Sequence, residues 1–306
     1  MLQVRSLVKV YPGPVAALQG VDLDVPPGMF GLLGPNGAGK STFMRILAGL
    51  LEPTSGGVTL DGHDTQKDPQ WLRERLGYLP QDFGFYAHLS GRDMLLHLLR
   101  LKGVQAPGGV KALADELLER VNLTFAAKRS VKSYSGGMRQ RLGIAQAIAG
   151  DPRLLIVDEP TAGLDPEERL RFYHLLAQLA EQRIVLLSTH IVEDVAVLCP
   201  QFAVIRSGRL VARTTPRAAR ESLTGRIFEG VVASSDLAGI RETRQVTQEL
   251  LVEGRHRVRI YTPDGSAPAG FEGVAPSLED AYLVLMRTGE LPGHDAGRST
   301  AATVTA

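Results

Sequence analysis

The sequence has little cysteine, little net charge and no long apolar run, and each shortage excludes a class of protein. One cysteine, Cys199, occurs among 306 residues, so no disulfide can form within the chain, which fits a reducing compartment. The net charge of +1 argues against a dedicated nucleic-acid binder. No stretch approaches the roughly 18 apolar residues of a membrane-spanning helix, and Met1–Arg5 lacks the apolar segment of a signal peptide. Any membrane role is therefore expected to depend on a partner.

The residues that are present are those of an ordinary soluble globular protein. Apolar residues make up 44% of the chain and charged residues 22%, which is a typical balance for this class. The length allows one large domain or two, with a sizeable buried core.

A glycine-rich loop between two apolar segments is the most informative stretch of the chain. Met29 to Leu33 predicts a short buried strand, and apolar residues at helical spacing from Phe43 to Leu50 predict a helix. The loop between them matches the phosphate-loop pattern of Gly, four residues and Gly-Lys-Ser/Thr. Its residues are Gly34, Pro35, Asn36, Gly37, Ala38, Gly39, Lys40, Ser41 and Thr42.

The composition of this phosphate loop suits a nucleotide. Glycines let backbone N–H groups approach phosphate oxygens, and the helix start adds the positive end of its dipole. Lys40 can reach the β- and γ-phosphates, and the Ser41 hydroxyl can ligate Mg²⁺. The loop therefore predicts a site for ATP and Mg²⁺. The alternative, a turn that matches the pattern by accident, is disfavoured by the flanking strand and helix.

Strand and helix patterns alternate through most of the chain. The aliphatic runs 154–157 and 184–187 are typical of strands covered on both faces, and the segment 167–182 between them reads as an amphipathic helix. This alternation predicts an α/β fold with a largely parallel sheet. Further strands are expected at 2–10, 21–25, 58–60 and 76–79, a hairpin at 202–212, and helices at 71–75, 94–101, 113–121, 135–149 and 216–223.

The density of these patterns suggests three parts. A main domain is expected at 1–223, with a helical subdomain at about 82–150. A small accessory domain is expected at 224–288, where weaker patterns indicate strands and a last helix. Residues 289–306 are small and polar and are expected to form a disordered tail.

Two acids follow the buried strand at 154–157. Ligands of open α/β sheets sit at the carboxyl ends of the strands. Asp158 is suited to hold Mg²⁺, and Glu159 to polarise a water molecule for attack on the γ-phosphate. The alternative is that both acids cap the following turn. The phosphate loop favours the first interpretation because it supplies a reason for the metal ion.

Together these motifs resemble a known family. Tyr134-Ser135-Gly136-Gly137-Met138 (the signature segment, 134–138) precedes Asp158-Glu159-Pro160-Thr161 and is similar to the Leu-Ser-Gly-Gly-Gln signature of ATP-binding cassette (ABC) ATPases. The resemblance covers about 2–215. It implies a P-loop NTPase fold of the ABC ATPase type, with an N-terminal antiparallel β-subdomain, a helical subdomain and a small C-terminal α+β accessory domain. Tyr134 and Met138 depart from the usual leucine and glutamine.

The resemblance also implies roles for individual residues. Two ATPase subunits of this family pack head to tail, so the signature segment of one faces the phosphate loop of the other. The resemblance implies that Ser135, Gly136 and Gly137 contact the ATP of the opposite subunit, and that the loop at 162–165, which ends in Asp165, lies at the dimer interface. It implies that Gln81 senses Mg²⁺ and the attacking water, and that His190 is a switch at the γ-phosphate. It also implies that Tyr11 stacks on the adenine ring.

Each of these assignments has a plainer alternative. His190 could be a loop or capping residue, Tyr11 a packing residue at a strand end, and Gln81 a turn residue after Pro80. The run Arg139-Gln140-Arg141 is interpreted as a solvated or interface face rather than a binding code.

The resemblance predicts the ATP-hydrolysing subunit of an ABC transporter, working as a homodimer or heterodimer. A separate transmembrane permease would hold it at the cytoplasmic face of the membrane, with 81–123 as the docking surface and no nucleic-acid partner. The segment 276–283 is similar to the C-terminal end of drug- and antibiotic-export ATPases, which favours export. The alternative for this segment is simply an amphipathic helix with an acidic start.

Two competing functions are less well supported. A soluble ABC protein acting on ribosomes or DNA usually carries two cassettes or a long coiled coil, and this sequence shows neither. A regulatory module that binds ATP without hydrolysis is disfavoured because Glu159 and His190 are both present.

Overall fold

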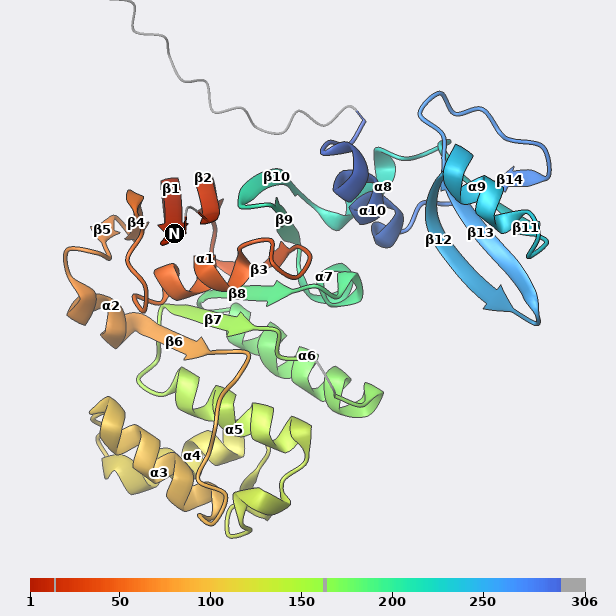
Figure 1. The fold of residues 1–306 in the computed structure, drawn as a ribbon. Coiled ribbons are helices and arrows are strands. Elements are labelled where there is room, and N and C mark those ends of the chain that lie inside the picture. The colour runs from red at the N-terminus through yellow and green to blue at the C-terminus, as the bar shows by residue number, and fades with distance from the viewer. Residues whose placement is uncertain (14, 162–163, 293–306) are drawn as a thin grey trace, which may run out of the picture. The chain divides into compact units, whose positions relative to one another are not determined.

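The computed structural model describes residues 1–13, 15–161 and 164–292, and its internal contacts divide the chain into two units (Figure 1). Unit 1 comprises Met1–His190 with Ser207–Arg209, and unit 2 comprises Ile191–Arg206 with the residues from Leu210 onward. Residues 162 and 163 of the predicted interface loop, and residues 293–306 of the predicted tail, lie outside the described residues. The predicted domain limits at 223 and 288 stay predictions.

Unit 1 is built on parallel strands that are buried on both faces. The strand order is β3-β8-β7-β6, every neighbouring pair is parallel, and all residues of β7 and β8 are buried. These strands are β3 (Gly28–Leu33), β6 (Leu76–Leu79), β7 (Leu154–Asp158) and β8 (Ile184–Thr189). One face is covered by α1 (Lys40–Leu47) and the other by α5 (Gly136–Ile148) and α6 (Pro166–Ala180), as Figure 1 shows. The predicted α/β architecture is confirmed.

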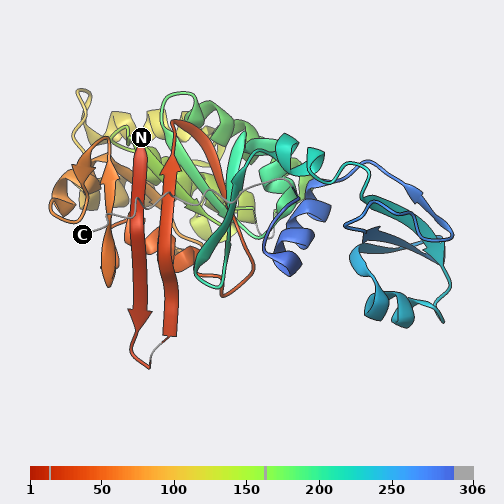
Figure 2. The same ribbon diagram turned by 90° about the horizontal axis from the view of Figure 1, so that it is seen from above.

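A second, antiparallel sheet in unit 1 has the order β2-β1-β4-β5. Its strands are β1 (Leu2–Tyr11), β2 (Val15–Val25), β4 (Ser55–Leu60) and β5 (His63–Asp64). Figure 2 shows the long arrows of β1 and β2 side by side. β2 begins six residues before the predicted strand at Val21, because Val15 and Ala16 are exposed and give no apolar alternation.

The helical part of unit 1 follows β6. Its helices are α3 (Gly91–Lys102), α4 (Gly109–Arg120) and α5, with short 3₁₀ turns at Thr124–Ala126 and Val131–Ser133, and α2 (Pro69–Arg75) lies just before it. α3 begins where the Ser90 hydroxyl accepts a hydrogen bond from the Asp93 N–H, and it ends at Gly103, whose positive φ of 68° suits glycine. The predicted helices are confirmed, and most extend beyond their apolar positions.

Unit 2 contains β9, most of β10 and a small antiparallel sheet of order β12-β13-β11-β14. Its elements are α7 (Val192–Leu198), β9 (Gln201–Arg206), β10 (Arg209–Thr214), α8 (Pro216–Glu221), β11 (Ile227–Val232), α9 (Leu237–Thr243), β12 (Gln245–Val252), β13 (Arg255–Tyr261), β14 (Phe271–Gly273) and α10 (Leu278–Thr288). Phe228, Val258 and Ile260 form the centre of the core beneath this sheet. The sequence did not indicate α7, α9, β12 or β14.

The acidic start of α10 has a structural role. Ser277 and Asp280 form a reciprocal cap at its first turn. The buried Asp280 carboxylate also accepts hydrogen bonds from the Thr247 hydroxyl at 2.5 Å and from Arg259 Nη1 at 2.8 Å. The Leu-Glu-Asp pattern therefore fastens α10 to β12 and β13.

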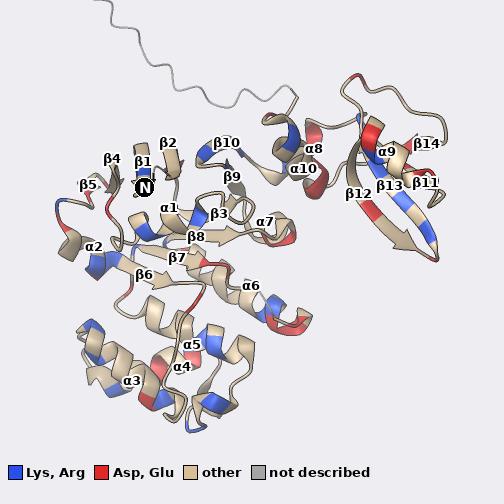
Figure 3. Ribbon diagram, viewed as in Figure 1, with Lys and Arg blue, Asp and Glu red and all other residues tan. Residues whose placement is uncertain are grey.

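Acidic and basic positions are interspersed along the helices and strands of each unit rather than gathered on one element (Figure 3). In the part of the chain that the structure describes, no helix is long and apolar enough to span a bilayer.

Candidate active site

Four of the predicted site segments follow four neighbouring parallel strands. The phosphate loop follows β3. Asp158 is the last residue of β7, and Glu159 comes directly after it. His190 follows β8, and Gln81 comes two residues after β6. Because the carboxyl ends of parallel strands meet at one edge of a sheet, the fold gathers these segments there.

The phosphate loop passes close to other backbone. Gly37 and Gly39 have φ values of 77° and 106°, which favour glycine. A Cβ at Gly39 would lie 2.5 Å from the Ala17 carbonyl oxygen. The Gly208 N–H donates to the Ala38 carbonyl at 2.9 Å, so the turn at 207–209 supports the loop. The loop thus needs its glycines for conformation as well as for phosphate access.

The Lys40 side chain folds back along its own loop. Its Nζ donates to the carbonyls of Gly34 at 2.8 Å and Pro35 at 3.1 Å, and lies 3.5 Å from Glu159 Oε1. Burial lowers the pKa of the Lys40 ammonium group, while the Glu159 carboxylate opposes that shift. The ammonium group of Lys40 and the carboxylate of Glu159, the candidate base, therefore face each other directly.

Glu159 is also in contact with His190. The Nδ1 of His190 lies 2.9 Å from Glu159 Oε2, and the Glu159 N–H donates to the Ser188 carbonyl. Glu159 has a φ of 48°, a strained value for a residue with a side chain. A carboxylate held by an imidazole is the arrangement expected of a general base with an orienting partner.

The residues present fit a magnesium ion. Asp158 is buried, and its Oδ1 has no hydrogen-bond partner among the described residues. Burial raises the pKa of this carboxyl group, and a bound cation would reverse that shift. No cluster of three acidic, histidine or cysteine side chains exists in the described ranges. A single buried carboxylate with a free oxygen is a ligand of the kind that Mg²⁺ takes, together with hydroxyls, water and substrate phosphates.

A cavity of about 580 Å³ brings together most of the phosphate loop, Gln81 and Glu159, whereas Asp158 and His190 are not among its lining residues. It is lined by Val15, Ala16, Ala17, Gln19, Pro35, Asn36, Gly37, Gly39, Lys40, Ser41, Thr42, Gln81, Glu159, Ser207 and Gly208. Sequence reasoning missed the lining residues 15–17, 19 and 207–208, which carry no chemical signature. Tyr11 is outside this lining, although its hydroxyl lies 3.4 Å from Thr42 Oγ1, and its role in adenine stacking stays a prediction.

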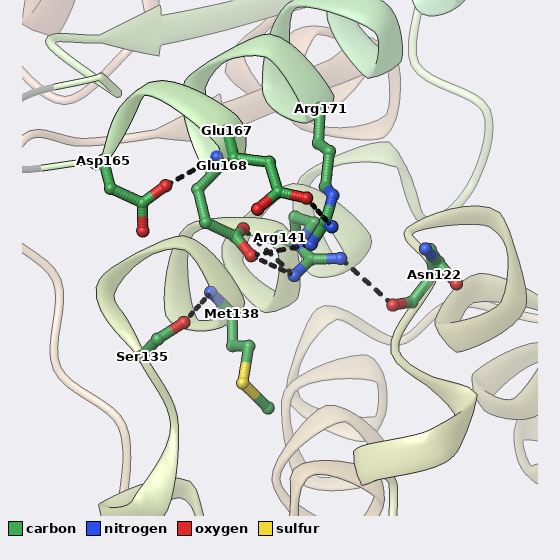
Figure 4. Close-up of polar contacts among 8 residues, drawn as sticks. All are labelled: Asn122, Ser135, Met138, Arg141, Asp165, Glu167, Glu168 and Arg171. Carbon is green, nitrogen blue, oxygen red and sulfur yellow. Dashed lines mark hydrogen bonds and ion pairs between the residues drawn. The ribbon is translucent and has the colours of Figure 1, made fainter.

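The signature segment lies elsewhere. Ser135 caps α5 by accepting a hydrogen bond from the Met138 N–H at 3.2 Å (Figure 4), and Ser135 and Gly136 are exposed. Neither they nor Gly137 line the cavity that contains Lys40. Asp165, which caps α6, does not line it either. The structure thus separates the predicted site residues into two groups.

The two departures from the usual signature are both buried. Tyr134 is 2% exposed, and its hydroxyl donates to the Ala126 carbonyl at 2.8 Å. Met138, in the first turn of α5, is 8% exposed. The backbone of Ser135 and Gly136 therefore remains the exposed feature of this segment.

The chain has clear relatives. A family model described as ABC transporter matches residues 18–162. The chain is 39% identical over 229 residues to the daunorubicin/doxorubicin resistance ATP-binding protein DrrA of Streptomyces peucetius, covering 74% of this chain and 69% of that protein. It is 34% identical over 244 residues to the linearmycin resistance ATP-binding protein LnrL of Bacillus subtilis (strain 168), and the match covers 79% of this chain and 76% of that protein.

A solved structure supports the same assignment. The ATP-binding cassette MJ0796, in a dimeric post-hydrolysis state bound to ADP and Pi, superposes with a TM-score of 0.63 at 25% identity. The match covers 70% of this chain and 98% of that one. With the phosphate loop, the acids after β7 and the fold, these relationships show that the chain belongs to the ABC transporter family and is an ATP-binding ABC ATPase.

Proposed function

We propose that this chain is the ATP-hydrolysing subunit of an ABC exporter, which binds MgATP in a head-to-tail dimer and works through a separate membrane permease. The observation that carries this proposal is the separation of the two groups of site residues. Lys40 and Glu159 line the cavity, whereas the exposed Ser135 and Gly136 at the start of α5 are not among its lining residues, although a helix start is suited to bind an anion. A second subunit would complete each cavity with its own signature segment.

Hydrolysis follows from the contacts around Glu159. Loop N–H groups and Lys40 bind the phosphates, Glu159 accepts the proton of the attacking water, and His190 fixes the carboxylate at Oε2. Ser41, Gln81 and Asp158 are the residues that would hold Mg²⁺, which supplies charge neutralisation at the phosphates. Tyr11 would contact the adenine ring.

The cycle would be driven by differential binding. ATP switches the dimer only because the closed state binds it more tightly than ADP. Ser135, Gly136, Gly137 and Asp165 act in the closed state, where they meet the nucleotide and interface of the opposite subunit. Closure would then be transmitted to the permease.

The permease is proposed to dock on the helical side of unit 1, within or beside 81–123. A groove runs between the end of α1, α2, β6 and the end of α3. It is lined in part by Leu50 and Leu101, which are 65% and 73% exposed. A cytoplasmic helix of the permease would cover these apolar side chains and hold the subunit at the membrane face.

Export is favoured over import by the relatives. Both relatives named above are resistance proteins by name, against daunorubicin/doxorubicin and linearmycin. Resistance to a compound is most simply achieved by moving it outward. The segment 276–283, which resembles the ends of such export ATPases, forms the capped start of α10.

Mixing two inactive variants tests whether the site is shared. Lys40→Ala removes a phosphate contact in one half-site. Ser135→Asp keeps a good helix cap but places a negative charge against the opposite phosphate. Each variant alone should be inactive, but a mixed dimer retains one site with both parts intact, so mixing should restore ATPase activity. No recovery after mixing would contradict a site formed in trans.

A further inference from the structure

Two helices of unit 1 begin side by side, and both starts belong to segments expected to act on the opposite subunit. α5 begins at the signature segment, where Ser135 accepts a hydrogen bond from the Met138 N–H. α6 begins after the predicted interface loop, where Asp165 Oδ1 accepts a hydrogen bond from the Glu168 N–H at 2.8 Å. Figure 4 shows both caps in one view.

The first turns of these helices approach so closely that a side chain at position 137 would displace the carboxylate of Glu168. A Cβ at Gly137 would lie 2.3 Å from Glu168 Oε2 and 3.1 Å from Glu168 Cβ. The carboxylate of Glu168 therefore packs directly against the first turn of α5. Gly137 thus has a packing role in its own chain, besides the predicted contact with phosphate.

A buried ion pair joins the two helices just behind this contact. Arg141 Nη2, on α5, donates to both carboxylate oxygens of Glu168, at 3.1 and 3.3 Å. The side chains are 5% and 15% exposed, so water and salt screen this pair little. Arg141 Nη1 also donates to the Asn122 carbonyl at 3.1 Å, which ties the residues after α4 to the same point. The sequence-based interpretation of 139–141 as a solvated or interface face is wrong for Arg141, because its side chain is buried within its own chain.

A neighbouring arginine shows what is specific to Arg141. Arg171 also reaches Glu168, with Nη1 3.2 Å from Oε1, and it contacts Glu167. Arg171, however, lies on α6 itself and is 49% exposed. Its contacts therefore stay within one helix, whereas the Arg141–Glu168 pair crosses between helices (Figure 4).

We propose that Arg141 and Glu168 are positioning residues that hold the starts of α5 and α6 in fixed register, so that the signature segment and Asp165 meet the opposite subunit as one body. This inference rests on the head-to-tail dimer of the proposed function. Neither residue lines the cavity of its own chain. Their loss should therefore weaken dimer closure while leaving the binding of nucleotide to the monomer intact.

The test compares two equilibria in the hydrolysis-deficient Glu159→Gln background. The first is ADP binding by the monomer, and the second is the ATP-dependent dimerisation constant from analytical ultracentrifugation. Adding Arg141→Met should weaken dimerisation by about three- to thirtyfold, the usual range for a residue in a coupling network, with ADP affinity unchanged. Glu168→Gln keeps the shape but loses the charge and should give a smaller effect. Arg171→Met is the matched control and should change neither constant.

The outcomes separate this inference from the function on which it rests. An unchanged dimerisation constant for Arg141→Met would overturn the inference while the head-to-tail dimer stands. Equal losses of ADP affinity and of dimerisation would also overturn it, because they would indicate general damage to the fold. If the Glu159→Gln parent does not dimerise with ATP, the proposed dimer fails and the inference fails with it.

Discussion

The carboxylate of Glu159 is shared between two side chains from different strand ends. Lys40 Nζ lies 3.5 Å from Oε1, and His190 Nδ1 lies 2.9 Å from Oε2. The backbone of Glu159 adopts a positive φ, which costs on the order of 1 kcal/mol for a non-glycine residue. A strained residue with both carboxylate oxygens held in place suggests that the orientation of Glu159 matters for the reaction.

Replacing Glu159 by glutamine tests its role as general base. The amide keeps the size of the side chain but cannot accept the proton of the attacking water. We expect nucleotide affinity to be retained and steady-state ATP hydrolysis to fall by roughly 10²–10⁴, the usual contribution of a positioned base. The check is the rate of phosphate release together with ATP binding. Equal rates for variant and parent would remove Glu159 from this role.

The sequence could predict the candidate residues with reactive side chains, but not the residues that only line the cavity. Lys40, Glu159 and His190 each follow an apolar strand, and the parallel order of those strands brings their ends together. Val15 and Ser207, by contrast, line the same cavity from opposite ends of unit 1's sequence. They contribute backbone and shape rather than reactive groups, so no residue type or spacing marks them in the sequence.

At the scale of elements, the first residue of α3 and the signature segment depend on each other. Gly91 is buried against Tyr134, and a Cβ at Gly91 would lie 1.9 Å from the Tyr134 hydroxyl oxygen. That hydroxyl donates to Ala126 in the first 3₁₀ turn. Tyrosine can therefore stand where the family usually has leucine because residue 91 has no side chain.

A double-mutant cycle measures this dependence. Gly91→Ala should destabilise the chain by about 1–3 kcal/mol, the usual cost of overpacking a core. Tyr134→Leu alone should also destabilise it, because it leaves a void and removes a buried hydrogen bond. The double variant should be more stable than the sum of the two changes predicts, since the new methyl group enters the space of the lost hydroxyl. Urea denaturation gives the three free energies, and strict additivity would contradict the account.

The strands that the sequence predicted most plainly are those that are deeply buried. β7 and β8 are continuous aliphatic runs because helices cover both of their faces. In β12 only Thr247 is fully buried, and in α9 only Leu237, so neither element carries a periodic apolar pattern. The sequence did not indicate the ion pair between Arg141 and Glu168 either, because the two residues are 27 positions apart and meet only in the folded chain.

At the scale of the whole molecule, the evidence for function is concentrated in unit 1. The family match at 18–162, the nucleotide cavity and the signature segment all lie within it. Unit 2 adds a sheet whose core centres on Val258 and Ile260, and an α10 fastened through Asp280. An accessory domain at 224–288 stays a prediction, and its role is not indicated by any residue of the nucleotide site.

The most direct test of the central claim is the mass of the Glu159→Gln protein in solution, first with ATP and Mg²⁺ and then with ADP. The chain has a mass of 33.0 kDa. The account predicts about twice that mass with ATP, because in the proposed dimer the γ-phosphate would join the phosphate loop of one subunit to the signature segment of the other. With ADP the protein should be a monomer. A monomer under both conditions would contradict a nucleotide site formed between two copies of this chain.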